Sequence, residues 1–266
     1  MSRGASIAKL NDTGINEDAF CAADRCIAVS DGAGGCGLFA DEWSRYLIEH
    51  LPKEKPICSF AELDGWVDGI WEPFYNEHEE VAKRGDGIFL NKYYNEGSCA
   101  TIAVAWRVSD EECRWMAYGD SVVFHYDRAT GRLEHSFTRL ADFSRPPRLV
   151  SCKDPLEEAG FRCGTFRTSP SSVVFAASDA LSHYVLMMYE LSRVREYGEE
   201  LAEEYKSQSG NSQLLKTAEK SAVDFDKDVI DELVQCAGSE EALKRLVAEL
   251  TLIGVLDADD YTLVML

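Results

Sequence analysis

The sequence predicts an α+β fold: a four-layer α-β-β-α sandwich in which two mainly antiparallel sheets pack together, with helices outside. The first observation behind this prediction is the order of the segments, which is strands, helices, strands, helices, strand. Strands grouped in this way are not typical of a doubly wound parallel sheet. The second observation is that no low-complexity linker interrupts the 266 residues, 45% of which are hydrophobic. We therefore expect a single domain, 1–266.

The expected strands are short apolar runs rich in β-branched and aromatic residues. They lie within 21–30 after a turn at Asp24-Arg25, and at 98–108, 114–118, 122–126 and 172–178, with a last strand after the acidic cluster at 257–260. Residues 139–165 contain three prolines. Because proline interrupts regular structure, this stretch is expected to be a loop or flap.

The expected helices have apolar residues at helical spacing. The first covers 38–50 after a glycine-rich turn, the second covers roughly 60–83, and helical composition returns at 182–252 around a polar loop at 207–212. In the second helix, the buried stripe is expected to contain Trp66, Ile70, Trp71 and Phe74.

The composition argues against several classes of partner. The formal net charge is -20, from 47 acidic and 27 basic residues. Such a charge repels the phosphates of DNA and RNA, so we expect no nucleic-acid partner. No run approaches the ~20 apolar residues of a membrane-spanning helix, and residues 1–6 lack the apolar core of a signal peptide. We expect a cytoplasmic monomer that does not use a membrane.

Nine cysteines are scattered along the chain without a CxxC pair: Cys21, Cys26, Cys36, Cys58, Cys99, Cys113, Cys152, Cys163 and Cys236. We interpret them as free thiols, most of them buried, in a reducing compartment. Their spacing argues against a zinc site and against a catalytic Cys–His pair.

Carboxylates lie at the edges of several apolar strands. Asp31 ends the strand at 21–30 and is followed by a glycine-rich turn, and Asp179 ends the strand at 172–178 in a similar context. The other two sites are the doublets Glu17-Asp18 and Asp259-Asp260. If these strands are neighbours, the carboxylates meet at one end of a sheet and form the oxygen-only shell that Mg²⁺ or Mn²⁺ prefers. No histidine lies beside them in sequence, which argues against zinc.

A structural interpretation exists for each of these acids. Aspartate often follows a strand as a turn residue or as a helix cap. Composition and spacing alone leave the metal site and the structural interpretation open.

Six short segments carry a family resemblance. In chain order they are Asn16-Glu17-Asp18-Ala19, Asp31-Gly32-Ala33-Gly34-Gly35, Gly97-Ser98-Cys99-Ala100, Gly119-Asp120-Ser121, Ser178-Asp179-Ala180-Leu181 and Asp259-Asp260-Tyr261-Thr262. Each is weak alone, but in this order they resemble the motifs of the metal-dependent serine/threonine protein phosphatases, the PPM or type 2C family, across almost the whole chain.

The resemblance implies a centre of two Mg²⁺ or Mn²⁺ ions. Asp31 would bridge both ions, the Gly32 carbonyl and Glu17 would bind one, and Asp179 and Asp259 would complete the other. Asp18 would hold the metal-bound water, which attacks phosphorus in line without a protein nucleophile. Asp120 is interpreted as mainly structural, although it could support a third, weaker ion.

The sequence departs from the family pattern at four positions. Thr13 stands where an arginine usually grips the substrate phosphate, and Lys9 is the nearest upstream cation that could take this role. Ala33 replaces a histidine of some members, Ala180 replaces a glycine, and Asp260 replaces an asparagine. Metal binding is therefore better supported than phosphate binding.

Several other polar residues have structural and functional interpretations. His183, four residues after Asp179, could reach the edge of the site, but a core or helix-start histidine explains it as well. Arg139, Arg145 and Arg148 in the expected flap could meet a phosphopeptide or simply face solvent.

The resemblance implies hydrolysis of phosphoserine and phosphothreonine in phosphoprotein substrates. The alternative is a catalytically weak or inactive member that serves as a binding or regulatory module, which Thr13 and Asp260 motivate. A third hypothesis is the hydrolysis of a small phosphoester.

Overall fold

The computed structural model describes residues 1–10, 14–206, 210–219 and 224–266. Its centre consists of two five-stranded sheets, and every strand pairing in them is antiparallel. In spatial order, the first sheet contains β1 (Arg3–Ile7), β12 (Tyr261–Met265), β11 (Ser172–Ala177), β7 (Val122–Asp127) and β8 (Arg132–His135). The second contains β10 (Phe161–Arg167), β6 (Glu112–Tyr118), β5 (Ile102–Arg107), β3 (Cys26–Asp31) and β2 (Asp18–Ala23).

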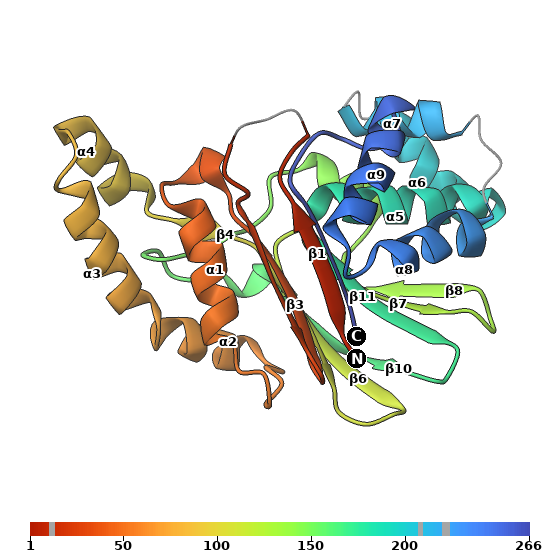
Figure 1. Ribbon diagram of the computed structural model, residues 1–266, viewed down its shortest axis with the longest axis horizontal. Coiled ribbons are helices and arrows are strands. Elements are labelled where there is room, and N and C mark those ends of the chain that lie inside the picture. The colour runs from red at the N-terminus through yellow and green to blue at the C-terminus, as the bar shows by residue number, and fades with distance from the viewer. Residues whose placement is uncertain (11–13, 207–209, 220–223) are drawn as a thin grey trace.

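Helices cover the outer face of each sheet, as Figure 1 shows. The second sheet is covered by α1 (Ala40–His50), α2 (Phe60–Asp68) and α3 (Trp71–Ala82), with α4 (Gly87–Glu96) beyond them. The first sheet is covered by α5 (Asp179–Ser192), α6 (Val194–Lys206), α7 (Gly210–Ala218), α8 (Glu232–Cys236) and α9 (Glu240–Leu252). The predicted α+β sandwich is confirmed.

The strands read as continuous apolar runs because both of their faces are buried. In β3, Ile27 and Val29 belong to the core between the sheets, whereas Ala28 packs toward the helices that cover the second sheet. Since alternate side chains of a strand point to opposite faces, a strand in the middle of four layers has no polar face.

The prediction of one helix over 60–83 is wrong in its extent. The segment forms α2 and α3, which are separated at Gly69 and Ile70. Phe74 is buried as predicted, but Trp66, Ile70 and Trp71 are only partly buried at the edge of the helical layer. The indole nitrogen of Trp66 donates to the His50 carbonyl oxygen at 3.0 Å, which explains why this ring stays at the edge.

Several elements were not expected from the sequence. They include β1, β2, β8, α4 and β10, and the last of these begins inside the stretch expected to be a flap. The rest of that stretch contains two short 3₁₀ turns, Leu140–Ser144 and Glu158–Gly160, and β9 (Val150–Ser151), which pairs with β4 (Cys99–Ala100). All nine cysteines are free, and Cys36, Cys58 and Cys163 are exposed. No helix within the described ranges has both the length and the apolar character needed to cross a membrane.

Candidate metal centre

The strand register brings the predicted carboxylates to one end of the sandwich. Asp18 begins β2 and lies directly opposite Asp31, the last residue of β3. Asp179 follows the end of β11, while Asp259 precedes the start of β12. Because β11 and β12 are antiparallel, the end of one lies beside the start of the other. Four segments that are distant in sequence therefore deliver carboxylates to the same place.

Glu17 is held by the glycine-rich turn. Its Oε2 accepts a hydrogen bond from the Gly34 backbone N–H at 3.0 Å, and its carbonyl oxygen accepts one from Gly32 at 3.1 Å. A β-carbon at Gly34 would collide with the Glu17 carboxylate, and one at Gly32 would lie 2.6 Å from the Ala40 carbonyl oxygen. Glycine is thus required at both positions by close packing rather than by an unusual backbone angle.

Asp18 is a buried carboxylate whose two oxygens accept no hydrogen bond from the described residues. It is 8% exposed. Burial, with a smaller contribution from Asp260 and Asp259, raises its pKa to about 7. The hydroxyls of Ser178 and Thr262 lie near enough to favour the ionised form, although neither makes a hydrogen bond of normal geometry with Asp18.

Asp31 and Asp179 have pKa values well above the usual range. Burial is the main cause for both, and the next cause is repulsion from neighbouring carboxylates. Asp18, Asp179 and Asp120 act on Asp31, and Asp120 and Asp259 act on Asp179. These charges are close enough to interact strongly, so they form one electrostatic cluster.

Asp259 and Asp260 differ in their contacts. Asp259 belongs to the carboxylate cluster, and its pKa is raised mainly by burial. Asp260 accepts hydrogen bonds from the Lys9 N–H at 2.8 Å and from the Glu17 N–H at 2.7 Å. The Asp260 carboxylate therefore anchors the N-terminal segment beside the cluster through two backbone N–H groups. The Lys9 side chain is exposed, and its charge lowers the pKa of Asp259.

A small cavity of about 120 Å³ opens between the cluster and the start of α5. Its acidic lining comes from Asp120, Asp179, Asp259 and Asp257. Burial raises the pKa of Asp120 to about 6, against the opposing effect of Arg162. Asp257 was not identified as a candidate from the sequence, although it stands in the same acidic stretch as Asp259.

His183 fits both of its interpretations. It is 5% exposed, and it lines this cavity while its Nε2 has no hydrogen-bond partner within the described part of the chain. Burial lowers its pKa to about 4, so it is neutral at physiological pH.

Thr13 lies outside the described residues. Arg139 and the other two arginines of the expected flap differ in their contacts. Arg139 contacts Asp142 and donates to Glu203 at 2.7 Å, which ties it to α6. Arg145 and Arg148 line a separate cavity beside Asp120.

The donor set suits a hard divalent cation. It consists of oxygens only, apart from the neutral His183 at its edge, and Asp18 supplies two buried oxygens that lack partners. In the positions that the described side chains adopt, no three Asp, Glu, His or Cys groups come together tightly enough to hold an ion. The cluster thus has the chemistry of a cation site and the repulsion that a cation would relieve.

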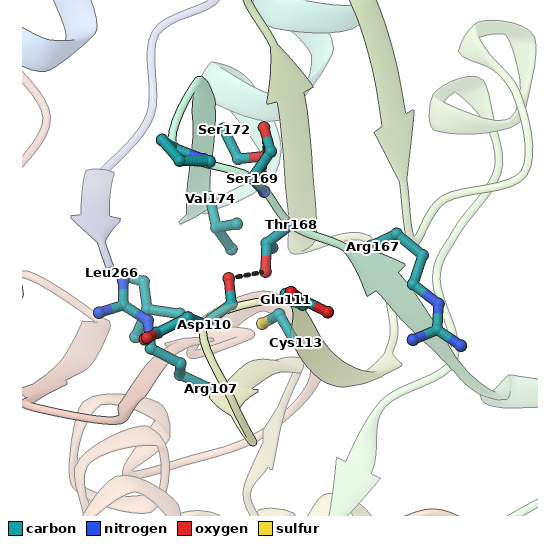
Figure 2. Close-up of a pocket in the computed structure, with 11 residues that line it drawn as sticks. Arg107, Asp110, Glu111, Cys113, Arg167, Thr168, Ser169, Ser172, Val174 and Leu266 are labelled. Atoms are coloured by element: carbon teal, nitrogen blue, oxygen red, sulfur yellow. Dashed lines mark hydrogen bonds between the residues drawn. The ribbon is translucent and has the colours of Figure 1, made fainter.

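A larger cavity lies at the opposite end of the sandwich. It measures about 760 Å³ and lies where β5 ends and β11 begins, next to Leu266. Figure 2 shows its lining, which includes Arg107, Arg167 and the Thr168 hydroxyl that donates to the Asp110 carbonyl oxygen at 2.9 Å. None of the predicted site residues lines it.

Known proteins resemble this chain in structure but not detectably in sequence. No protein-family model matches the sequence, and no curated protein matches it either. Solved structures do match. The catalytic domain of the serine/threonine protein phosphatase PstP, solved with two manganese ions, has a TM-score of 0.56 at 16% identity, with 100% of this chain and 96% of that chain covered.

Two further solved structures match over nearly the whole length of this chain. PppA from Pseudomonas aeruginosa has a TM-score of 0.53 at 15% identity, covering 100% of this chain and 96% of that chain. The serine/threonine phosphatase Stp1 from Staphylococcus aureus has a TM-score of 0.52 at 12% identity, covering 99% of this chain and 93% of that chain. This chain therefore has the PPM fold, the fold of the PP2C-type serine/threonine phosphatases.

Proposed function

We propose that this protein is a metal-dependent phosphatase that hydrolyses phosphoserine and phosphothreonine in proteins. The observation that carries the proposal is the cluster of buried, mutually repelling carboxylates at one end of a fold shared with serine/threonine phosphatases. Strongly perturbed carboxylates are typical of functional sites, because an ordinary fold gains nothing from burying like charges together.

The residues present would hold two Mg²⁺ or Mn²⁺ ions. Asp31 would contribute to both ions, Glu17 and the Gly32 carbonyl to one, and Asp179 and Asp259 to the other. Asp120 would support a third, weaker ion. When bound, two such ions supply Lewis-acid activation of water and neutralise charge on the phosphoryl group.

The chain's own groups position the reactants. Asp18, with a pKa of about 7, would accept a hydrogen bond from the attacking water and orient it toward phosphorus. The water oxygen forms a new bond to phosphorus as the bond to the seryl or threonyl oxygen breaks. The products are inorganic phosphate and the free hydroxyl. Lys9 would contact the phosphate from the side of Asp259.

The experiment that tests this proposal is hydrolysis of p-nitrophenyl phosphate and of a phosphothreonine peptide with and without metal. EDTA should abolish turnover, and added Mn²⁺ should restore it. Full activity in Asp31→Asn or Asp179→Asn would disprove the assignment. Calorimetry that shows Mn²⁺ binding without turnover on any phosphopeptide would instead support a binding module. A strong preference for small phosphoesters over the peptide would support a metabolite phosphatase.

A further inference from the structure

A second cavity adjoins the carboxylate cluster on the side of residues 137–162. It measures about 390 Å³ and contains three guanidinium groups, those of Arg145, Arg148 and Arg162. In a chain of net charge -20, three arginines around one cavity make a local exception. Asp120 lines this cavity and also the small cavity that contains Asp179 and Asp259. The arginine cavity is therefore separated from the proposed metal ligands by a single side chain.

Arg162 is the arginine that the fold holds most firmly. It lies on β10 opposite Ala117 of β6, and one of its terminal nitrogens donates to the Gly119 carbonyl oxygen. Its Cζ lies 5.0 Å from the centroid of the Phe137 ring, close enough for a cation–π contact. These contacts fix the guanidinium beside the turn that carries Asp120, so little conformational freedom remains to be lost on binding a ligand.

Part of the hydrogen-bonding capacity of Arg162 is unused. Its Nε is buried and has no partner among the described residues, and no described carboxylate forms an ion pair with this guanidinium. An arginine carries five N–H donors in a planar fork that matches the oxygens of a phosphate. A buried donor without a partner is costly, so the fold alone does not account for this arginine, whose guanidinium lines the cavity.

Arg145 and Arg148 are placed differently. Arg145 contacts Asp142 at 3.1 Å with a side chain that is 67% exposed, and Arg148 pairs with Glu157 with a side chain that is 45% exposed. Both are therefore paired and close to solvent, at the mouth of the cavity. Arg162 is the arginine with free donors next to the cluster.

We propose that Arg162 binds the substrate's phosphoryl group, with its guanidinium donating to the non-bridging phosphate oxygens while Arg145 and Arg148 face the peptide around it. This inference rests on the proposed function and assigns the phosphate-binding group of that same site. A phosphate dianion lying between the cations and Arg162 would be charge-balanced on both sides, which the carboxylates alone cannot provide. Lys9 would then assist from the opposite side.

The test compares Arg162→Met with Arg167→Met, a matched change on the same strand. Arg167 is exposed at the far end of β10 and lines the large cavity instead. Inorganic phosphate binding is measured by calorimetry in saturating Mn²⁺, beside KM and kcat for p-nitrophenyl phosphate. Loss of charge-assisted hydrogen bonds should weaken phosphate binding roughly 10- to 100-fold in Arg162→Met and leave Arg167→Met unchanged.

Two additional measurements separate phosphate binding from a structural role. Mn²⁺ affinity should stay within about threefold of wild type in Arg162→Met, because the arginine does not contact the metal ligands directly. Arg162→Lys, which keeps the charge but loses the fork, should recover part of the phosphate affinity and serves as the second variant if the methionine protein does not fold. Unchanged phosphate affinity in both variants, or phosphate affinity lost only in step with Mn²⁺ affinity, would overturn the proposal.

Failure of the proposed function gives a different result. If wild-type protein binds phosphate through Arg162 in the presence of Mn²⁺ but hydrolyses no phosphoester, the assignment of Arg162 stands and catalysis does not.

Discussion

The two ends of the β-sandwich are built in opposite ways. At one end, Asp18, Asp31 and Asp179 are buried together, and their pKa values are raised mainly by burial and further by neighbouring carboxylates. At the other end, a cavity about six times larger by volume has polar side chains in its lining that interact with partners beside it. There the Ser172 hydroxyl lies 2.8 Å from His125 Nε2, and Arg167 lies 3.4 Å from Glu112.

Under the proposed function, unsatisfied charge rather than cavity size marks the active site in this molecule. A large cavity with satisfied polar groups costs the fold little and requires no ligand to explain it. A cluster of buried carboxylates lowers stability, and such a cost is commonly retained where activity depends on it. The predictions below test this contrast, beginning with the largest expected effect.

Replacing one carboxylate at each end should have very different effects on activity. Asp31→Asn should reduce kcat/KM for p-nitrophenyl phosphate by at least about 10³-fold, because it removes a charge that the metal centre requires. Asp110→Asn makes the same chemical change on the exposed rim of the large cavity and should leave kcat/KM unchanged. Equal losses in the two variants would remove the contrast between the ends.

Metal should stabilise the acidic end specifically. At Mn²⁺ concentrations near 100 times the dissociation constant, the free energy of unfolding of the wild type should rise by about 2.7 kcal/mol. Asp31→Asn should lose most of this increase, yet be more stable than the wild type in EDTA because one repelling charge is gone. Urea denaturation with Mn²⁺ and with EDTA measures both effects. A metal-free variant less stable than metal-free wild type would contradict the repulsion argument.

Glu190, a buried carboxylate outside the cluster, should make the stability of the protein depend on pH. Glu190 on α5 is 3% exposed, and burial, followed by Glu200 and Glu204, raises its pKa to about 8. Since the folded state binds this proton more tightly than the unfolded state, the contribution to stability is present at low pH and is lost as pH rises through 8.

The wild type should therefore lose stability relative to Glu190→Gln, by on the order of 2 kcal/mol between about pH 5 and pH 8. Urea denaturation of both proteins in saturating Mn²⁺ measures the difference, because other titrating groups are common to the two. A difference that does not vary with pH would show that Glu190 is not perturbed as described.

The smallest predicted effect concerns Asp260. Asp260→Ala removes the acceptors of the Lys9 and Glu17 N–H groups and should lower the free energy of unfolding by about 1–2 kcal/mol. It should also weaken Mn²⁺ binding by several-fold, because Glu17 is no longer anchored. Asp257→Ala is the control: the Asp257 side chain accepts only a local hydrogen bond, from the Ala258 N–H, among the described residues, so this variant should change stability less. Equal losses would assign the effect to charge rather than to anchoring.

The sequence predicted those features that depend on a local pattern of residues, such as a buried strand and the acidic residue that follows it. The apolar run ending at Asp31 is continuous because Ile27 and Ala28 face different cores, and the acids after such strands could be expected at one edge. The glycine-rich turn suggested that the backbone comes close to another group. The sequence did not reveal that this group is the Glu17 carboxylate at Gly34.

What could not be predicted depends on tertiary register. Arg162 lies near enough to Asp120 to influence its pKa only because β10 pairs with β6, and β10 begins in a stretch whose prolines suggested irregular structure. The role of Asp260 depends in the same way on backbone groups of a segment some 250 residues away. The break between α2 and α3 was hidden because apolar spacing continues through Gly69 and Ile70, where the helix does not.

The position of β12 has a consequence for how the protein is made. This strand lies between β1 and β11, yet it follows all the other strands of the two sheets along the chain. Until it arrives, the earliest and the later strands of the first sheet have no common partner, and Asp259 and Asp260 are missing from the cluster. The emerging chain therefore lacks two carboxylates of the proposed cation site until the segment that carries Asp259 and Asp260 has been made and β12 has inserted.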